Sequence, residues 1–153
     1  MARTSIYRQS TDDFTFLNLN PKGKFTGDCV IRAIAYALNK EWDDLIDELT
    51  EYTHRYKIPY DYSQLYEKYL KDQGYVRLAR PKKVDGKHYS VLEFCRMMDM
   101  FDLTHPVLMH VIPHHLTVIH RIDGKMKNID IWNCCSQKVG RVYIHKDDAE
   151  KYL

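Results

Sequence analysis

The chain has 153 residues and lacks an apolar run near the ~18 residues that a membrane-spanning helix needs. Its first residues, Met1–Ser5, contain no apolar segment typical of a secretory signal. Four cysteines are present, none spaced as Cys-x-x-Cys, and Cys134 and Cys135 are adjacent, so the pattern does not indicate a disulfide framework. We therefore expect a cytoplasmic protein with reduced thiols and no membrane association.

Positive charge is not concentrated either. Lys and Arg number 23 against 21 Asp and Glu, a formal net charge of +2 without a basic stripe, so no nucleic-acid partner is expected. Six of the twelve tyrosines recur at roughly helical spacing within residues 52–69, which favours packed helix flanks over base stacking. Hydrophobic residues at 44% and charged residues at 29% are ordinary for a folded protein, and the length predicts a single domain over residues 1–153.

Helical patterns dominate the first two thirds of the chain. Residues 1–19 are expected to form an extended N-terminal arm, followed by a loop rich in Asn, Pro and Gly. The first helix is predicted to carry its apolar residues on one face, with Asp28 as N-cap and Asn39 as terminator. Four helices are expected in all: Val30 to Leu38, Trp42 to a point before Pro59, a helix capped by Ser63 that ends near Gly74, and one capped by Ser90 that runs through Met98.

After Pro106 the pattern changes to short β-strands. Four strands are predicted, at Val107–Ile112, Leu116–Ile122, Ile129–Trp132 and Val142–Ile144. The preceding basic segment, Val76–His88, is expected to be a loop or a short irregular strand. Because helices come first and strands last, the pattern predicts an α+β fold with a C-terminal antiparallel sheet.

A hairpin turn fixes the expected register of two of these strands. Asp123-Gly124 tolerates the positive φ angles of a tight turn, which places Ile122 opposite Lys125. In the same register Thr117 faces Asp130. Side chains alternate along a strand, so these two belong to the same face of the sheet.

The same register brings a histidine close to a carboxylate. His115 lies opposite Trp132, and its diagonal neighbour Asp130 is roughly 7 Å away between backbones, within side-chain reach. An imidazole base needs a partner on its second nitrogen, which an acid or an amide can supply. This register favours Asp130, whereas a loop of odd length would favour Asn133.

Cys29 stands where a polar loop turns into the first predicted helix. The free backbone N–H groups and the helix dipole at such a position favour the thiolate and so create a nucleophile. The alternative is a buried structural cysteine, as expected for Cys95 on the apolar face of the fourth helix.

These short blocks together resemble the papain-like cysteine peptidases, in their small bacterial and phage-type forms. The blocks are Gly27-Asp28-Cys29 at a helix start, His115–Ile119, Asp123-Gly124 and Asp130–Trp132, within a span from about Asn18 to Tyr143. The resemblance implies Cys29 as nucleophile, His115 as general base and acid, and Asp130 as the residue that orients the histidine. It also implies a papain-like fold with Cys29 at the start of the central helix.

The resemblance further implies a thiol acyl-transfer hydrolase that needs no cofactor and acts on a peptide, protein or amide, including isopeptides and cell-wall amides. The family often has a glutamine some six residues before the cysteine as an oxyanion donor, but here that position is Gly23. Asn20 is the nearest upstream amide, and the Cys29 backbone N–H is the other candidate donor. Trp132 and tyrosines of the second and third helices are candidate pocket residues.

Two other interpretations remain open. The first is a binding domain of the same fold with an unreactive Cys29. The second is a zinc domain that uses residues gathered in the C-terminal third: His110, His114, His115, His120, Cys134 and Cys135. Adjacent cysteines seldom bind one ion together, and His114 and His115 alternate in direction, so no metal is expected and Cys134 and Cys135 are interpreted as packing thiols.

Overall fold

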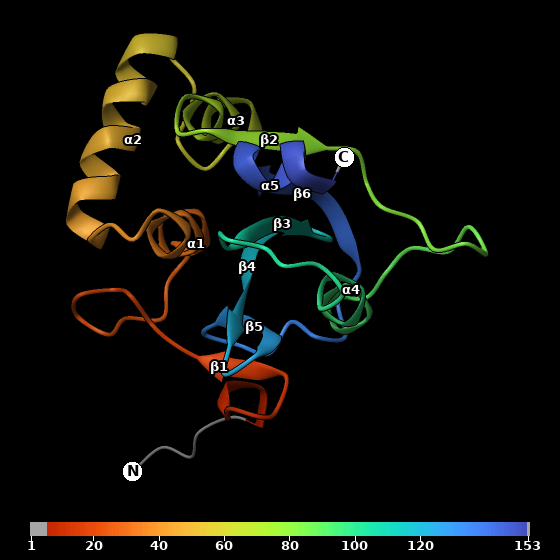
Figure 1. Cartoon of the computed structure of the whole chain (residues 1–153). Coiled ribbons are helices and arrows are strands. Elements are labelled where there is room, and N and C mark those ends of the chain that lie inside the picture. Colours follow the sequence, from red (N-terminus) through yellow and green to blue (C-terminus); the bar gives the residue numbers. More distant parts are fainter. Residues whose placement is uncertain (1–5, 153) are drawn as a thin grey trace.

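A six-stranded mixed β-sheet runs through the protein with helices on both sides, as the computed structural model in Figure 1 shows. The structure describes residues 6–152, so the first five residues of the predicted arm lie outside it. The described elements are η1 (Ile6–Arg8, a 3-10 helix), β1 (Phe14–Phe16), α1 (Cys29–Leu38), α2 (Trp42–Tyr56), α3 (Ser63–Asp72), β2 (Tyr75–Leu78), α4 (Val91–Met98), β3 (Val107–Val111), β4 (His115–Ile122), β5 (Lys125–Asp130), β6 (Val139–His145) and α5 (Lys146–Tyr152). The strand order is β1-β5-β4-β3-β6-β2.

All four predicted helices are present. α1 ends at Leu38, and its C-cap Asn39 adopts the left-handed conformation with φ 53°, as its role of terminator requires. α4 begins with a full capping box, in which Ser90 accepts from the Glu93 backbone and Glu93 accepts from the Ser90 backbone. The prediction of Ser63 as a cap was wrong by one position, because Tyr62 is the N-cap and Ser63 is the first residue of α3.

The predicted hairpin register is confirmed. Asp123 and Gly124 have φ angles of 52° and 80°, and Ile122 pairs with Lys125 across the β4–β5 turn. β5 begins and ends earlier than expected, at Lys125 and Asp130. Asp130 is therefore the last residue of β5, at the end of the strand where the chain leaves the sheet.

The prediction of a purely C-terminal, antiparallel sheet was wrong. β1, from the N-terminal arm, pairs parallel with β5, and β2 pairs antiparallel with β6 at the opposite edge. Each edge strand is short, three residues in β1 and four in β2, and short edge strands limit the unpaired backbone that a sheet exposes. The expectation that strands follow all helices also fails at the C-terminus, where α5 follows β6.

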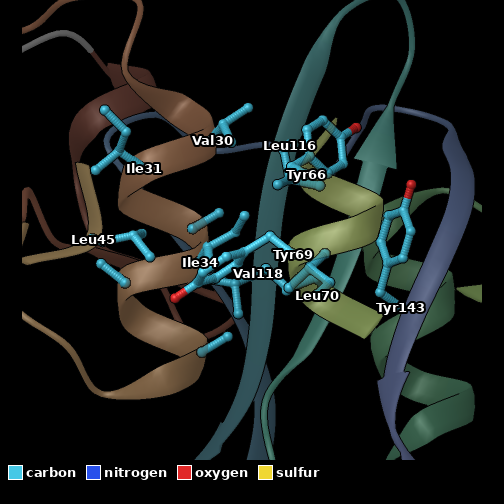
Figure 2. Close-up of a cluster of buried hydrophobic side chains, with 14 of the residues drawn as sticks. Val30, Ile31, Ile34, Leu45, Tyr66, Tyr69, Leu70, Leu116, Val118 and Tyr143 are labelled. Carbon is cyan, nitrogen blue, oxygen red and sulfur yellow. The ribbon is translucent and has the colours of Figure 1, made fainter. Parts of the chain in front are cut away.

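The sheet separates two apolar cores. One lies between α1, α2, α3 and the sheet, where Figure 2 shows side chains of α1, α3 and β4 pointing toward one another, among them Ile34, Tyr69 and Val118. The other contains α4 residues such as Phe94 against Met109 and Val142. Among residues 6–152, no helix combines the length and the apolar character that a membrane crossing requires.

α1 is more deeply buried than a one-faced helix, which corrects the sequence-based prediction. Seven of its ten residues are buried: the continuous run from Val30 to Ala35, which includes Arg32, and Ala37. The cause is its central place, since α1 packs on β4 and is contacted by α2 as well. An arginine within such a helix needs buried partners for its charge.

Candidate active site

Cys29 is the first residue of α1 and is half-buried. The ring of His115 and the backbone of Leu116 lie next to its sulfur, and Cys29 and His115 line the same cleft. Burial alone would raise the pKa of the Cys29 thiol, but the hydrogen-bonding groups of His115 and Leu116 and the positive charges of His115 and Arg32 outweigh burial and lower the pKa. The site therefore favours a thiolate, as the sequence predicts for a cysteine at a helix start.

His115 begins β4 and lies between the sulfur and a carboxylate. Its Nε2 is 2.6 Å from Oδ2 of Asp130, which leaves Nδ1 for Cys29. Burial lowers the pKa of His115, but the bonds to Asp130 and Cys29 raise it to about 9. His115 is therefore protonated at neutral pH, and the lowered pKa of Cys29 favours the thiolate beside it, the charged form that a cysteine nucleophile requires.

Asp130 is the end point of a buried hydrogen-bond network. Its carboxylate accepts bonds from five donors: His115 Nε2 (2.6 Å), Thr117 Oγ1 (2.6 Å) and Cys134 Sγ (3.5 Å) on Oδ2, and Arg32 Nη1 (2.9 Å) and the Ile131 backbone N–H (2.7 Å) on Oδ1. Burial raises the pKa of Asp130, yet the bonds to His115 and Thr117 and the charge of Arg32 lower it overall. Asp130 is thus held ionised beside the histidine.

Arg32 is the residue of this network that the sequence analysis missed. Its Nε lies 2.6 Å from Oδ1 of Asp28, and its Nη1 lies 2.9 Å from Oδ1 of Asp130. All three residues are buried, with Arg32 only 6% exposed. The available signal was the spacing of Asp28 and Arg32, one helical turn apart in a segment that is otherwise apolar.

The loop before α1 is tied to the same network through Asp28. Oδ2 of Asp28 accepts bonds from Asn20 Nδ2 (3.1 Å) and Trp42 Nε1 (3.0 Å). The Asn20 side-chain oxygen accepts from the backbone N–H of Lys22 and Lys24 and so shapes the loop. Asn20 therefore has a clear structural role, and its role as oxyanion donor stays a prediction.

Asp130 and Asn133 were the two candidates for orienting His115, and in the structure it is Asp130 that hydrogen-bonds the imidazole. Asn133 accepts a bond from the Cys135 backbone N–H at 2.9 Å and shapes the turn after β5. Trp132 packs on His115 with ring centroids 5.0 Å apart and an interplanar angle of 49°. Its packing restricts rotation of the imidazole, whereas its predicted contact with substrate stays a prediction.

An open cleft of about 590 Å³ leads to the sulfur. Cys29 and His115 lie on its wall together with residues of the α3 region, the β3–β4 turn and β6: Asp61, Tyr62, Ser63, Tyr66, His110, His114 and Arg141. Among the predicted pocket residues, tyrosines of the third helix region line this cleft, whereas Trp132 and the tyrosines of the second helix are not on its wall. The volume is sufficient for several residues of an extended peptide.

The six residues of the zinc interpretation do not converge on one point, although His110, His114 and His115 line the same cleft. His120 Nδ1 bonds the Tyr36 hydroxyl at 2.8 Å on the α1 side of the sheet. Within residues 6–152, potential ligand atoms converge at His115, Asp130 and Cys134, and at His105, His145 and Asp147. In the first group, burial raises the pKa of the Cys134 thiol, which disfavours the thiolate that a metal binds.

Comparison of the chain with models of protein families, with curated proteins and with solved structures finds no match in any of the three. The functional argument therefore starts from the geometry of Cys29, His115 and Asp130.

Proposed function

We propose that the protein is a cysteine-dependent hydrolase of papain-like type that cleaves amide bonds of peptides or proteins. The observation that carries the proposal is the continuous path from Cys29 through His115 to Asp130, which joins the start of α1 to the end of β5. A purely structural cysteine has no need of a buried imidazole–carboxylate pair aimed at its sulfur.

The arrangement supports two half-reactions. The Cys29 thiolate attacks the substrate carbonyl carbon to form a C–S bond, and His115 gives its proton to the leaving nitrogen as the C–N bond breaks. In the second half, His115 takes a proton from water, whose oxygen attacks the thioester carbon. The C–S bond then breaks and releases a carboxylic acid, and the thiolate and imidazolium are restored.

The start of α1 supplies donors for the oxyanion. The first N–H groups of an α-helix have no partner within the helix, and they point toward its N-terminal end. Since Cys29 is the first residue of α1, its backbone N–H lies beside the reacting carbon. Asn20, held by Asp28 in the preceding loop, is the second proposed donor.

Incubation with a complex peptide pool tests the reaction class. We expect new peptide termini, found by mass spectrometry, with the wild-type protein and their loss in Cys29→Ala and His115→Ala. Asn133→Ala is the matched control, because Asn133 is close in sequence to Asp130 but bonds the Cys135 backbone instead. A binding domain with the same fold produces no terminus that depends on Cys29, and that result overturns the proposal.

A further inference from the structure

We propose that Arg32 is a positioning residue of the Cys29 site, whose guanidinium holds the Asp130 carboxylate in place and neutralises Asp28 so that the thiolate can form. This inference rests on the proposed hydrolase function. It assigns a role to a buried charge that lies outside the triad.

The guanidinium spans two carboxylates, and among residues 6–152 no other cation contacts both of them. Nε donates to Asp28 at 2.6 Å and Nη1 donates to Asp130 at 2.9 Å, with the side chain 7% exposed. Because Arg32 occupies Oδ1 of Asp130, the other oxygen, Oδ2, is directed to His115. The rigid fork of arginine suits this double contact, whereas lysine offers only a point charge.

Charges of opposite sign alternate along the row Asp28, Arg32, Asp130, His115 and Cys29. Asp28 directly precedes Cys29 in the chain, so its negative charge disfavours a thiolate next to it. Arg32 offsets this charge and also attracts the thiolate itself. Without Arg32, two buried carboxylates face the site with His115 as their single remaining cation within the row.

Other charged or titratable groups lie near the sulfur or near His115, and each is unchanged in the test below. They come from the α3 region, β3 and its turn, β6 and the segment after β5: Tyr60, Asp61, Tyr66, His110, His114, Arg141 and Cys134. Because these groups stay constant, a shift between variants reports on Asp28 and Arg32 alone.

The test is the pH dependence of Cys29 alkylation by iodoacetamide, whose lower midpoint reports thiolate formation. Arg32→Gln removes a positive charge, so the midpoint should rise by about 0.5 to 1 pH unit. Asp28→Asn removes a negative charge, so the midpoint should fall. If Arg32 had a merely structural role, the midpoints of both variants would shift in the same direction or not at all. The midpoint of Arg32→Lys should be nearer to that of wild type than the midpoint of Arg32→Gln.

Arg55→Gln is the matched control, because Arg55 also pairs with an acid one turn earlier, Glu51, but on the exposed surface of α2. Its midpoint should equal that of wild type. If Arg32→Gln does not fold, as judged by thermal melting, the double variant Asp28→Asn/Arg32→Gln replaces it. The double variant should then have a higher midpoint than Asp28→Asn.

The outcomes separate this inference from the function on which it rests. If Arg32→Gln folds and its alkylation midpoint equals that of wild type, the inference is overturned while the hydrolase proposal stands. The same holds if the double variant has the same midpoint as Asp28→Asn. If Cys29 of the wild type reacts like an ordinary thiol at every pH, the hydrolase proposal itself fails.

Discussion

Arg32 in α1 and Asp130 at the end of β5 form a buried ion pair of 2.9 Å between residues 98 positions apart in the chain. The pair joins the helix that carries the candidate nucleophile to the strand that carries the residue orienting its base. Fold and proposed chemistry therefore depend on the same contact.

Removing one partner of this pair should destabilise the fold strongly. Asp130→Ala leaves Arg32 facing Asp28 alone and deprives His115, Thr117 and Arg32 of an acceptor, so we expect a loss of about 3–5 kcal/mol in the free energy of unfolding. Urea denaturation measures this loss. Glu51→Ala, which breaks the exposed pair with Arg55, should cost little. Equal losses in the two variants would contradict the account.

Proton linkage gives a second prediction. An unfolded thiol has a pKa of 9.0 and an unfolded imidazole one of 6.5, whereas in the folded protein the pKa of Cys29 is lowered and that of His115 is raised to about 9. Between pH 6.5 and 9 folding thus adds a proton to His115, so this group makes stability fall as the pH rises. Between its lowered folded pKa and 9.0, Cys29 loses a proton on folding, which has the opposite sign, so the pair makes the free energy of unfolding less dependent on pH than His115 alone would.

The Cys29→Ser variant should show how much His115 alone contributes to the pH dependence of stability. Serine does not titrate, so the folded variant binds a proton on His115 that the unfolded chain releases above pH 6.5. Stability should then fall by about 1–2 kcal/mol as the pH rises from 6.5 toward the folded pKa of His115. Urea unfolding at several pH values measures the slope, and Cys29→Ser/His115→Ala should remove it. Parallel slopes in wild type and Cys29→Ser would refute the charged pair.

Gly140 supports the wall of the cleft. A Cβ added there would lie 2.7 Å from His110 Nδ1 and 3.1 Å from the His110 backbone oxygen, and rotation of the ring cannot relieve the second contact. Gly140→Ala should therefore destabilise the protein by about 1–3 kcal/mol and displace His110. Gly27→Ala is the control, since nothing lies within 4 Å of its added Cβ. Thermal melting of both variants measures the change in stability. A melting temperature of Gly140→Ala equal to that of wild type would contradict the close packing of Gly140 against His110.

Local signals in the sequence were enough to predict the parts of the site that depend on one turn or one helix end. The Asp123-Gly124 turn admits positive φ, and this fixes the β4–β5 register that brings Thr117 and His115 within hydrogen-bond reach of Asp130. The start of α1 at Cys29 followed from the apolar pattern after a polar loop.

Contacts between segments that are distant in the chain could not be predicted from the sequence. β1 has three residues, too few for a recognisable alternation, and it exists because its backbone pairs with β5. The spacing of Arg32 from Asp28 indicates a local ion pair, but only the three-dimensional contact shows that Asp130 is its second buried partner. Both features depend on where distant segments meet.

The most direct measurement of the central claim is the rate at which iodoacetamide modifies Cys29 at pH 6, with each cysteine mapped by mass spectrometry. An unperturbed thiol with a pKa of 9.0 is about one part in a thousand thiolate at this pH. The account predicts modification of Cys29 at least about tenfold faster than a free thiol, slow reaction of Cys95, Cys134 and Cys135, whose pKa values burial raises, and loss of the advantage in His115→Ala. A Cys29 that reacts no faster than a free thiol, and is unaffected by His115→Ala, would contradict it.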